Sequence, residues 1–137
     1  MKLKIINGKE YIFDIVRKKY VLNQPEEWVR QHIIKYLNEK KNYPISLMSV
    51  EKQININQTI KRYDLVCYNT NGKPLFLVEC KAPNIKLNIE TFNQSFNYQN
   101  EVKAKYIMVT NGTTHFCFEI KNEKPIFLKE IPHYTIK

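Results

Sequence analysis

Two segments of the sequence carry apolar residues at the spacing of an α-helix. A helix is predicted over residues 23–44 because Val29, Ile33 and Leu37 recur three to four positions apart. The asparagine at the start of this segment can cap a helix, and the proline at its end cannot continue one. A second helix is predicted over residues 89–102, where phenylalanines recur on one face.

The other segments form short apolar or alternating runs, which are typical of β-strands. Each of the three glycines follows an asparagine, and Asn-Gly favours a tight turn between paired strands. The order helix, three strands, helix and further strands predicts an α/β fold (α+β, with a mixed sheet flanked by helices) in one domain of residues 1–137. Strands are expected at residues 2–21 (one or two short strands), 45–56, 62–68, 73–81, 105–110, 115–120 and 125–130.

The central hairpin of this pattern brings two carboxylates together. A two-residue turn at Asn71-Gly72 places Asp64 directly opposite Glu79 on the paired strand. Cross-strand neighbours have Cβ atoms about 4.5–5.5 Å apart. Lys81 lies two residues after Glu79 and projects from the same face. Two acids and one ammonium therefore share the rim of an otherwise apolar surface.

Like charges placed opposite each other destabilise a sheet, so something must compensate the two acids. A shared proton, a basic side chain or a divalent cation can do this. Oxygen ligands that are partly open to water suit Mg²⁺ or Mn²⁺, and such a site can activate a water for attack on a phosphate. The alternative is an edge salt bridge, Glu79 with Lys81 or Asp64 with Arg62, worth under about 1 kcal/mol. The residues alone leave both interpretations open.

Charge and composition indicate which class of molecule the protein binds and where in the cell it is expected. The chain carries 22 basic and 13 acidic residues, a net charge of +9 that suits a polyanion such as nucleic acid. The alternative is nucleotide bias in the coding gene, because the chain is rich in Lys, Asn and Ile. The longest apolar runs are about four residues, whereas a membrane helix needs about 20. With no apolar signal core and three widely spaced cysteines, we expect a cytoplasmic protein with reduced thiols and no membrane span.

Four stretches of sequence together resemble a known family. They are QPEEWVRQ at the first helix, RYDLVCYNTNG with LFLVECKAP at the hairpin, FNQSFNY on the second helix and YIMVTNG after it. Asp64 followed by Glu79-Cys80-Lys81 resembles the D…(D/E)xK signature of the PD-(D/E)xK nuclease superfamily. Within that superfamily the chain resembles the N-terminal nuclease domain of type I restriction enzyme R subunits, in a small stand-alone form.

This resemblance implies a fold and a chemistry. The fold is a restriction-endonuclease-like core of helix, three strands, helix and strand, here with extra N- and C-terminal strands. The implied activity is metal-dependent hydrolysis of DNA phosphodiester bonds with Mg²⁺ or Mn²⁺. Asp64 and Glu79 would hold the metal, and Lys81 would orient or deprotonate the attacking water. A third ligand is implied on the first helix, where Glu26 is the preferred residue and Glu27 the alternative.

Gln94 and Tyr98 match a QxxxY element found in this branch of the superfamily. On a helix they are neighbours on one face and, by the resemblance, would contact a phosphate or steady Lys81. The alternative is a polar, half-buried helix surface. The sequence has no GxxxxGK[ST] phosphate loop, so ATP-driven translocation is not expected.

The sequence alone leaves two other functions open. One is a non-catalytic nucleic-acid-binding module that keeps the nuclease fold, and the other is an adaptor that depends on a partner protein. A small nuclease without an ATP-driven motor would suit a homodimer or an assembly with partner subunits, but the sequence does not indicate which residues would form the interface.

Overall fold

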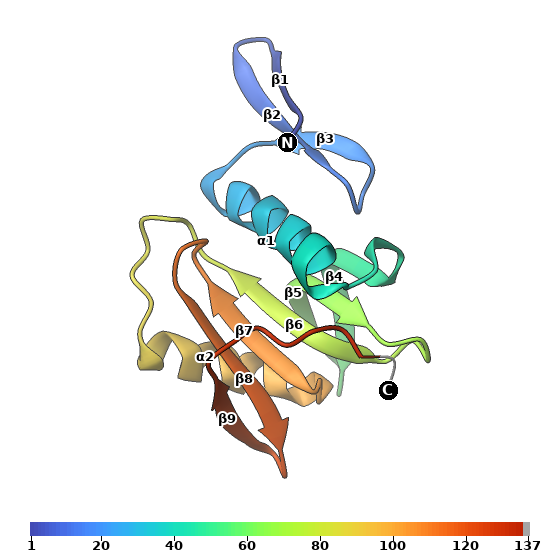
Figure 1. Cartoon of the computed structure of the whole chain (residues 1–137), viewed down its shortest axis with the longest axis vertical. Helices are drawn as coiled ribbons and strands as arrows, with labels where there is room; N and C mark the ends of the chain where they lie inside the picture. Colours follow the sequence, from blue (N-terminus) through green and yellow to red (C-terminus); the bar gives the residue numbers. More distant parts are fainter. Residues whose placement is uncertain (136–137) are drawn as a thin grey trace.

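A six-stranded sheet with one helix on each face forms the larger part of the described chain (Figure 1). A smaller, three-stranded sheet of N-terminal residues lies beside the first helix. The computed structural model describes the backbone of residues 1–135 and their side chains except those of residues 56, 95 and 97–100. The elements are β1 (Leu3–Ile6), β2 (Lys9–Asp14), β3 (Lys19–Leu22), α1 (Pro25–Lys41), a 3₁₀ turn (Ile45–Leu47), β4 (Met48–Ile56), β5 (Thr59–Tyr68), β6 (Pro74–Cys80), α2 (Ile89–Gln99), a second 3₁₀ turn (Asn100–Val102), β7 (Tyr106–Thr110), β8 (His115–Lys121) and β9 (Lys124–Leu128).

The N-terminal residues form three antiparallel strands, one more than expected. The first turn is the predicted Asn7-Gly8 turn, where Gly8 has a φ of +79°. The second turn is held by Asp14, whose carboxylate accepts hydrogen bonds from the backbone N–H groups of Val16 at 2.8 Å and Arg17 at 3.1 Å. An aspartate that binds the amide two residues later is a turn signal of its own, and a search for Asn-Gly pairs misses it.

Helix α1 lies where its apolar spacing predicts it. Pro25 occupies the first turn, but Gln24 rather than Asn23 is the residue that precedes the helix. The side chain of Asn23 donates instead to Glu10 Oε1 at 2.7 Å, which joins the small sheet to the start of the helix. At the other end Asn42 adopts a left-handed conformation, with a φ of +66°, and stops the helix.

The large sheet has the order β4-β5-β6-β7-β8-β9. Only the β6–β7 pair of this sheet is parallel, and α2 makes the crossover between those two strands. The first helix packs on one face of the sheet through Val29, Ile33 and Leu37. The second helix packs on the other face through Phe92. This arrangement confirms the expected mixed α+β fold, with a helix–three strands–helix–strand core and additional strands at both ends.

The β5–β6 hairpin has the predicted register but not the predicted turn. Leu65 pairs with Val78, as the Asn-Gly register requires. The connection is longer than two residues, however, because the Asn69 side chain accepts bonds from the backbone N–H groups of residues 71 and 73. A β-bulge between Cys67 and Tyr68 offsets the longer loop. The two-residue turn was therefore wrong, although the pairing beyond the bulge is the predicted one.

Candidate functional site

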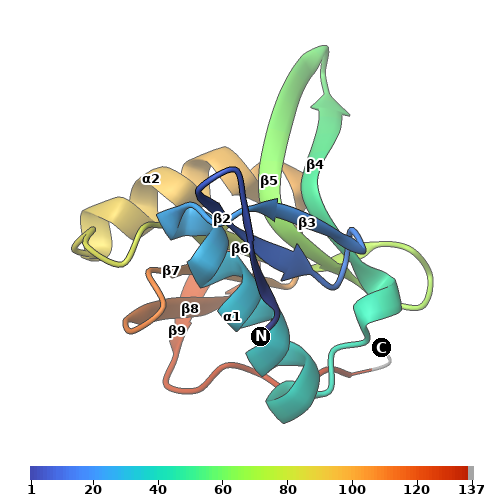
Figure 2. The same cartoon turned by 90° about the horizontal axis from the view of Figure 1, so that it is seen from above.

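The two predicted acids lie where β5 leaves its partner β6. The ladder between these strands begins at Leu65 with Val78, and Asp64 immediately precedes it. Beyond this point the β4–β5 hairpin projects away from the rest of the sheet (Figure 2). Asp64 Oδ2 accepts a hydrogen bond from the backbone N–H of Cys80 at 2.8 Å, so its carboxylate is held against the end of β6 beside Glu79.

Lys81 follows β6 and completes the predicted trio. Its Nζ lies 2.9 Å from Glu79 Oε2, and its backbone N–H donates to the carbonyl of Thr110 on β7 at 2.8 Å. The side chains of Glu79 and Lys81 are 21% and 38% exposed, so this end of the site is open to water. This ion pair is the contact that the edge salt bridge predicts.

Burial and charge act in opposite directions on Asp64. Loss of solvent raises the pKa of this carboxyl above its ordinary value, and the nearby charge of Glu79 adds to that effect. The Cys80 amide and the cations of Arg30 and Lys81 oppose it without reversing it. An acid in such surroundings gains from any additional cation placed beside it.

The two glutamates at the start of α1 lie in different environments. Glu26 is exposed, whereas Glu27 is only 8% exposed. The spacing of Val29, Ile33 and Leu37 places Glu26 on the same side of the helix as these apolar residues. The buried face of the helix is wider than this row, however, and it includes Glu27 and Arg30. The metal-ligand role of either acid stays a prediction, and the geometry shifts the preference from Glu26 to Glu27.

Glu27 is already engaged by protein donors. Its Oε1 accepts from Arg17 Nη2 at 2.8 Å, and its Oε2 accepts from Gln31 Nε2 at 2.9 Å. Arg30 Nε lies 3.5 Å from the same Oε2. Glu27 and Asp64 both act electrostatically on the buried thiol of Cys80. The helix acid therefore lies in the neighbourhood of the strand acids, with its charge balanced by arginines.

All three arginines of the sequence converge on Glu51 in β4. The nearest guanidinium nitrogens of Arg17, Arg30 and Arg62 lie 3.5, 3.4 and 3.1 Å from its carboxylate. Burial opposes ionisation of Glu51, but the three cations outweigh it and lower the pKa of this carboxyl. Sequence reasoning missed this cluster, although three arginines among 22 basic residues were a usable signal.

Glu51 and Asp64 are linked by the geometry of the β4–β5 ladder. The ladder pairs Val50 with Leu65 and Lys52 with Tyr63, and it is interrupted between them at Glu51, which has a φ of +55°. Arg30 lies close enough to Asp64 to lower the pKa of that acid. The arginine cluster thus connects the small sheet, α1 and the projecting hairpin around the same site.

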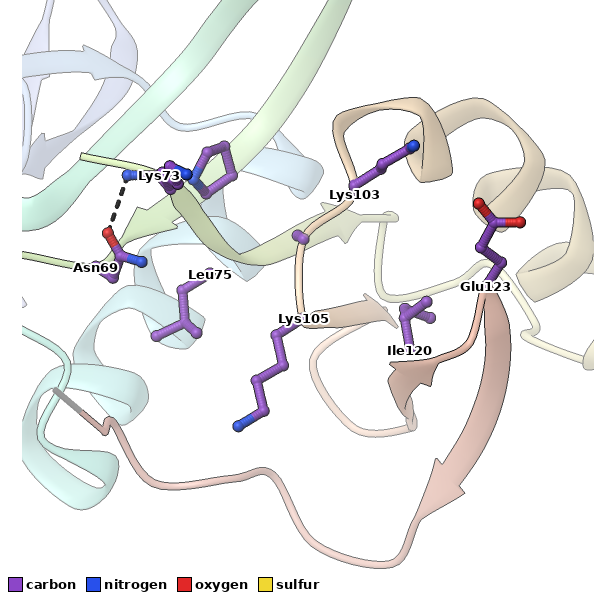
Figure 3. Close-up of a pocket in the computed structure, with 9 residues that line it drawn as sticks. Asn69, Lys73, Leu75, Lys103, Lys105, Ile120 and Glu123 are labelled. Carbon is purple, nitrogen blue, oxygen red and sulfur yellow. Dashed lines mark hydrogen bonds between the residues drawn. The ribbon is translucent and has the colours of Figure 1, made fainter. Parts of the chain in front are cut away.

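One cavity lies beside Glu27 and another lies at the far end of β6. The first, about 350 Å³, is lined by Glu26, Glu27, Arg30 and Glu51 together with the end of β3 and Gln24. The second, about 420 Å³, lies at the opposite end of β6 and is lined by Lys73, Lys103 and Lys105 among others (Figure 3). Neither lining includes Asp64, Glu79 or Lys81, but the first contains Glu27 and Arg30, and Arg30 acts electrostatically on Asp64.

The donor set fits Mg²⁺ in one respect and not in another. Asp64 and Glu79 offer carboxylate oxygens, and Mg²⁺ is commonly held by one or two carboxylates with waters and substrate phosphates. In the described part of the chain, however, no group of three or more His, Cys, Asp or Glu side chains is placed to hold a metal ion. A site of two strand carboxylates is therefore compatible with the structure, and the three-carboxylate site including Glu26 is not assembled.

The QxxxY pair remains a prediction. Gln94 is exposed on α2, and the side chain of Tyr98 lies outside the described residues. The three cysteines are free and buried, as expected. None of the helices in residues 1–135 is long and apolar enough to cross a bilayer.

The mixed sheet with one helix on each face is consistent with a nuclease-like α+β fold. The family model described as the type I restriction enzyme R protein N terminus matches residues 25–132, from α1 to beyond β9. The chain belongs to this family. No curated protein is similar enough in sequence to count as a match. Residues 1–24, which form the small sheet, lie outside the family match.

Proposed function

We propose that this protein is a metal-dependent nuclease that hydrolyses phosphodiester bonds of DNA. One observation carries the proposal: Asp64 and Glu79 lie on adjacent strands at one end of the sheet, with the ammonium of Lys81 2.9 Å from Glu79. Membership of a restriction enzyme family and a net charge of +9 both support a DNA substrate.

Asp64 and Glu79 are the residues that would hold Mg²⁺ or Mn²⁺. When bound, such a metal lowers the pKa of a coordinated water and offsets charge on the leaving oxygen. Asp64 is pre-positioned for this role, because the Cys80 amide fixes one carboxylate oxygen and leaves the other available. Glu79 must turn from Lys81, and its partial exposure gives it room to do so.

Lys81 and the arginines carry the remaining chemistry. The Lys81 ammonium can donate a hydrogen bond to the attacking water or to a phosphate oxygen once Glu79 turns away. Arg30 is 6% exposed, and its Nε and Nη1 have no hydrogen-bond partner in the described chain. Nε remains within 3.5 Å of Glu27 Oε2, and the charge of Arg30 also acts on Asp64, so the guanidinium adds positive charge beside the site.

A non-catalytic nucleic-acid-binding module is the second candidate. The observation that favours it is that Glu27 and Glu79 are both occupied by protein cations. A partner-dependent adaptor and a homodimeric assembly also stay proposals. The first function is preferred because the acids and the lysine are clustered at one strand end.

The test is cleavage of supercoiled, linear and single-stranded DNA with Mg²⁺ or Mn²⁺. Asp64→Asn and Lys81→Ala should each reduce cleavage by at least about a hundredfold. Glu90→Gln and Lys86→Ala are matched controls, because both residues are exposed outside the site, and they should cleave at the wild-type rate. Wild-type cleavage by both site variants would reject the proposal, and failure of the wild type on every substrate would favour the binding module.

A further inference from the structure

The small sheet has an outer face that the proposed nuclease site does not use. Alternate residues of a strand point to opposite faces, and the register assigns Ile12 and Asp14 to one face, where both are fully buried. No side chain of the other face is fully buried. This outer face consists of Lys2, Lys4, Ile6, Lys9, Tyr11, Phe13, Tyr20 and Leu22.

Lysines at the first strand lie beside aromatic rings of β2 and β3 on the outer face. Phe13 and Tyr20 are direct cross-strand partners, with ring centroids 5.3 Å apart in an edge-to-face arrangement. The Lys2 ammonium lies 5.6 Å from the Phe13 ring centroid, and the Lys4 ammonium lies 5.2 Å from that of Tyr20. Tyr11 pairs with Lys4 in the neighbouring row. The face therefore offers several ring surfaces, each with a cation beside it.

The charge of the outer face has one sign. Its own residues include three lysines and no acid, because Glu10 and Asp14 belong to the inner face. At its edge, Lys35 and Glu39 of α1 line a cavity together with Lys2 and Phe13. The first 24 residues contain six basic and two acidic residues, so they hold +4 of the net charge of +9. A ligand that complements this face must present negative charge and flat apolar groups together.

The face lies next to the nuclease site. Leu22 lines the same 350 Å³ cavity as Glu27 and Arg30. Arg17, in the turn after β2, binds Glu27 directly. A strand bound on the outer face would therefore reach the neighbourhood of Glu27 at the Leu22 end of this face.

We propose that the outer face of the β1–β3 sheet binds single-stranded nucleic acid, an inference that rests on the proposed nuclease function for the role of the bound strand. Bases stack on Phe13 and Tyr20, and Lys2 and Lys4 turn from the rings to the backbone phosphates. A duplex does not fit this chemistry, because its bases are stacked on one another and do not offer their faces to a sheet.

The binding test uses fluorescence anisotropy in EDTA, so that no cleavage occurs. The probe is a fluorescein-labelled oligodeoxythymidine of about 12 nucleotides, compared with a duplex of the same length. The single strand should bind more tightly than the duplex. Tyr20→Leu should weaken single-strand binding by about five- to a hundredfold, whereas Tyr20→Phe, which keeps the ring, should bind like the wild type.

A charge comparison locates the binding surface. Lys2→Glu with Lys4→Glu should weaken binding and reduce its dependence on salt. The matched control is Lys73→Glu with Lys103→Glu, two exposed lysines of the distant cavity in Figure 3, and it should leave binding unchanged. Circular dichroism melts confirm that each variant keeps its fold.

The inference is overturned by duplex binding as tight as single-strand binding, by an equal loss from both lysine pairs, or by equal binding of Tyr20→Leu and Tyr20→Phe. Competition by polyglutamate as strong as by unlabelled oligodeoxythymidine would also overturn it, because polyglutamate cannot stack. A protein that binds the oligonucleotide in this way but never cuts DNA rejects the nuclease proposal alone. A protein that cuts duplex DNA but fails to bind the oligonucleotide rejects this inference alone.

Discussion

Asp14 holds the small sheet against the first helix, and its removal gives the sharpest test of that connection. Its side chain is completely buried. Its carboxylate accepts hydrogen bonds from two backbone amides and from Arg17 Nε. The guanidinium of Arg17 also donates to Glu27 on the first helix. Asp14→Ala leaves these donors without their acceptor and removes one partner of a charge pair.

The size of the effect follows from burial. Breaking a buried ion pair by removing one partner costs about 3–5 kcal/mol. Arg17 is 22% exposed and keeps its contact with Glu27, so the lower limit applies and we expect a loss of about 3 kcal/mol. Asp14→Asn keeps an oxygen for the backbone amides and should lose about 1–2 kcal/mol.

Urea denaturation followed by circular dichroism measures these differences in the free energy of unfolding. Glu10→Ala is the matched control, because Glu10 is exposed and its removal should cost less than about 1 kcal/mol. If Asp14→Ala unfolds within about 1 kcal/mol of the wild type, the buried-carboxylate explanation of the turn is refuted.

Three further results are expected. Because the pKa of Glu51 is lowered in the folded protein, its ion pairs stabilise the fold at pH values above the unfolded carboxyl pKa of about 4.3. This stabilisation is lost as the pH falls through the pKa that Glu51 has in the folded protein. Glu51→Gln should therefore flatten the pH dependence of the free energy of unfolding in urea below about pH 5. The pKa of Asp64 is raised in the folded protein, so without metal the wild type loses stability as the pH rises through that pKa. Asp64→Asn should therefore have the larger free energy of unfolding at about pH 7. An equal or smaller free energy of unfolding for Asp64→Asn would contradict this reasoning. Burial raises the pKa of the Cys67 thiol to about 12 and that of Cys80 still further, so a thiol reagent such as dithionitrobenzoate should modify them only as fast as the chain unfolds.

Local patterns predicted the elements that carry strong signals. The spacing of Val29, Ile33 and Leu37 located α1, and the apolar strands of the central hairpin gave the correct pairing of Leu65 with Val78. The ladder ends one residue short of the predicted Asp64–Glu79 pair, and Asp64 is held beside Glu79 by its hydrogen bond from the Cys80 amide. The turn of the hairpin was predicted wrongly because a side-chain bond from Asn69 and a bulge, neither visible in periodicity, replaced the two-residue connection.

Interactions between distant segments could not be predicted. Glu51 meets arginines that lie 34 residues before it, 21 before it and 11 after it in the chain. The choice between Glu26 and Glu27 depended on the width of the buried helix face, which three apolar positions underestimate. Contacts between side chains so far apart in the chain produce no periodic pattern of residues in a single sequence.

The central claim is that Asp64 and Glu79 form a cation site, and calorimetric titration with Mn²⁺ tests it most directly. Wild-type protein should bind Mn²⁺ saturably, Glu79→Ala and Asp64→Asn should lose that binding, and the exposed control Glu90→Gln should keep it. Equal heats from the wild type and Glu79→Ala, or no saturable binding by the wild type, would contradict the claim.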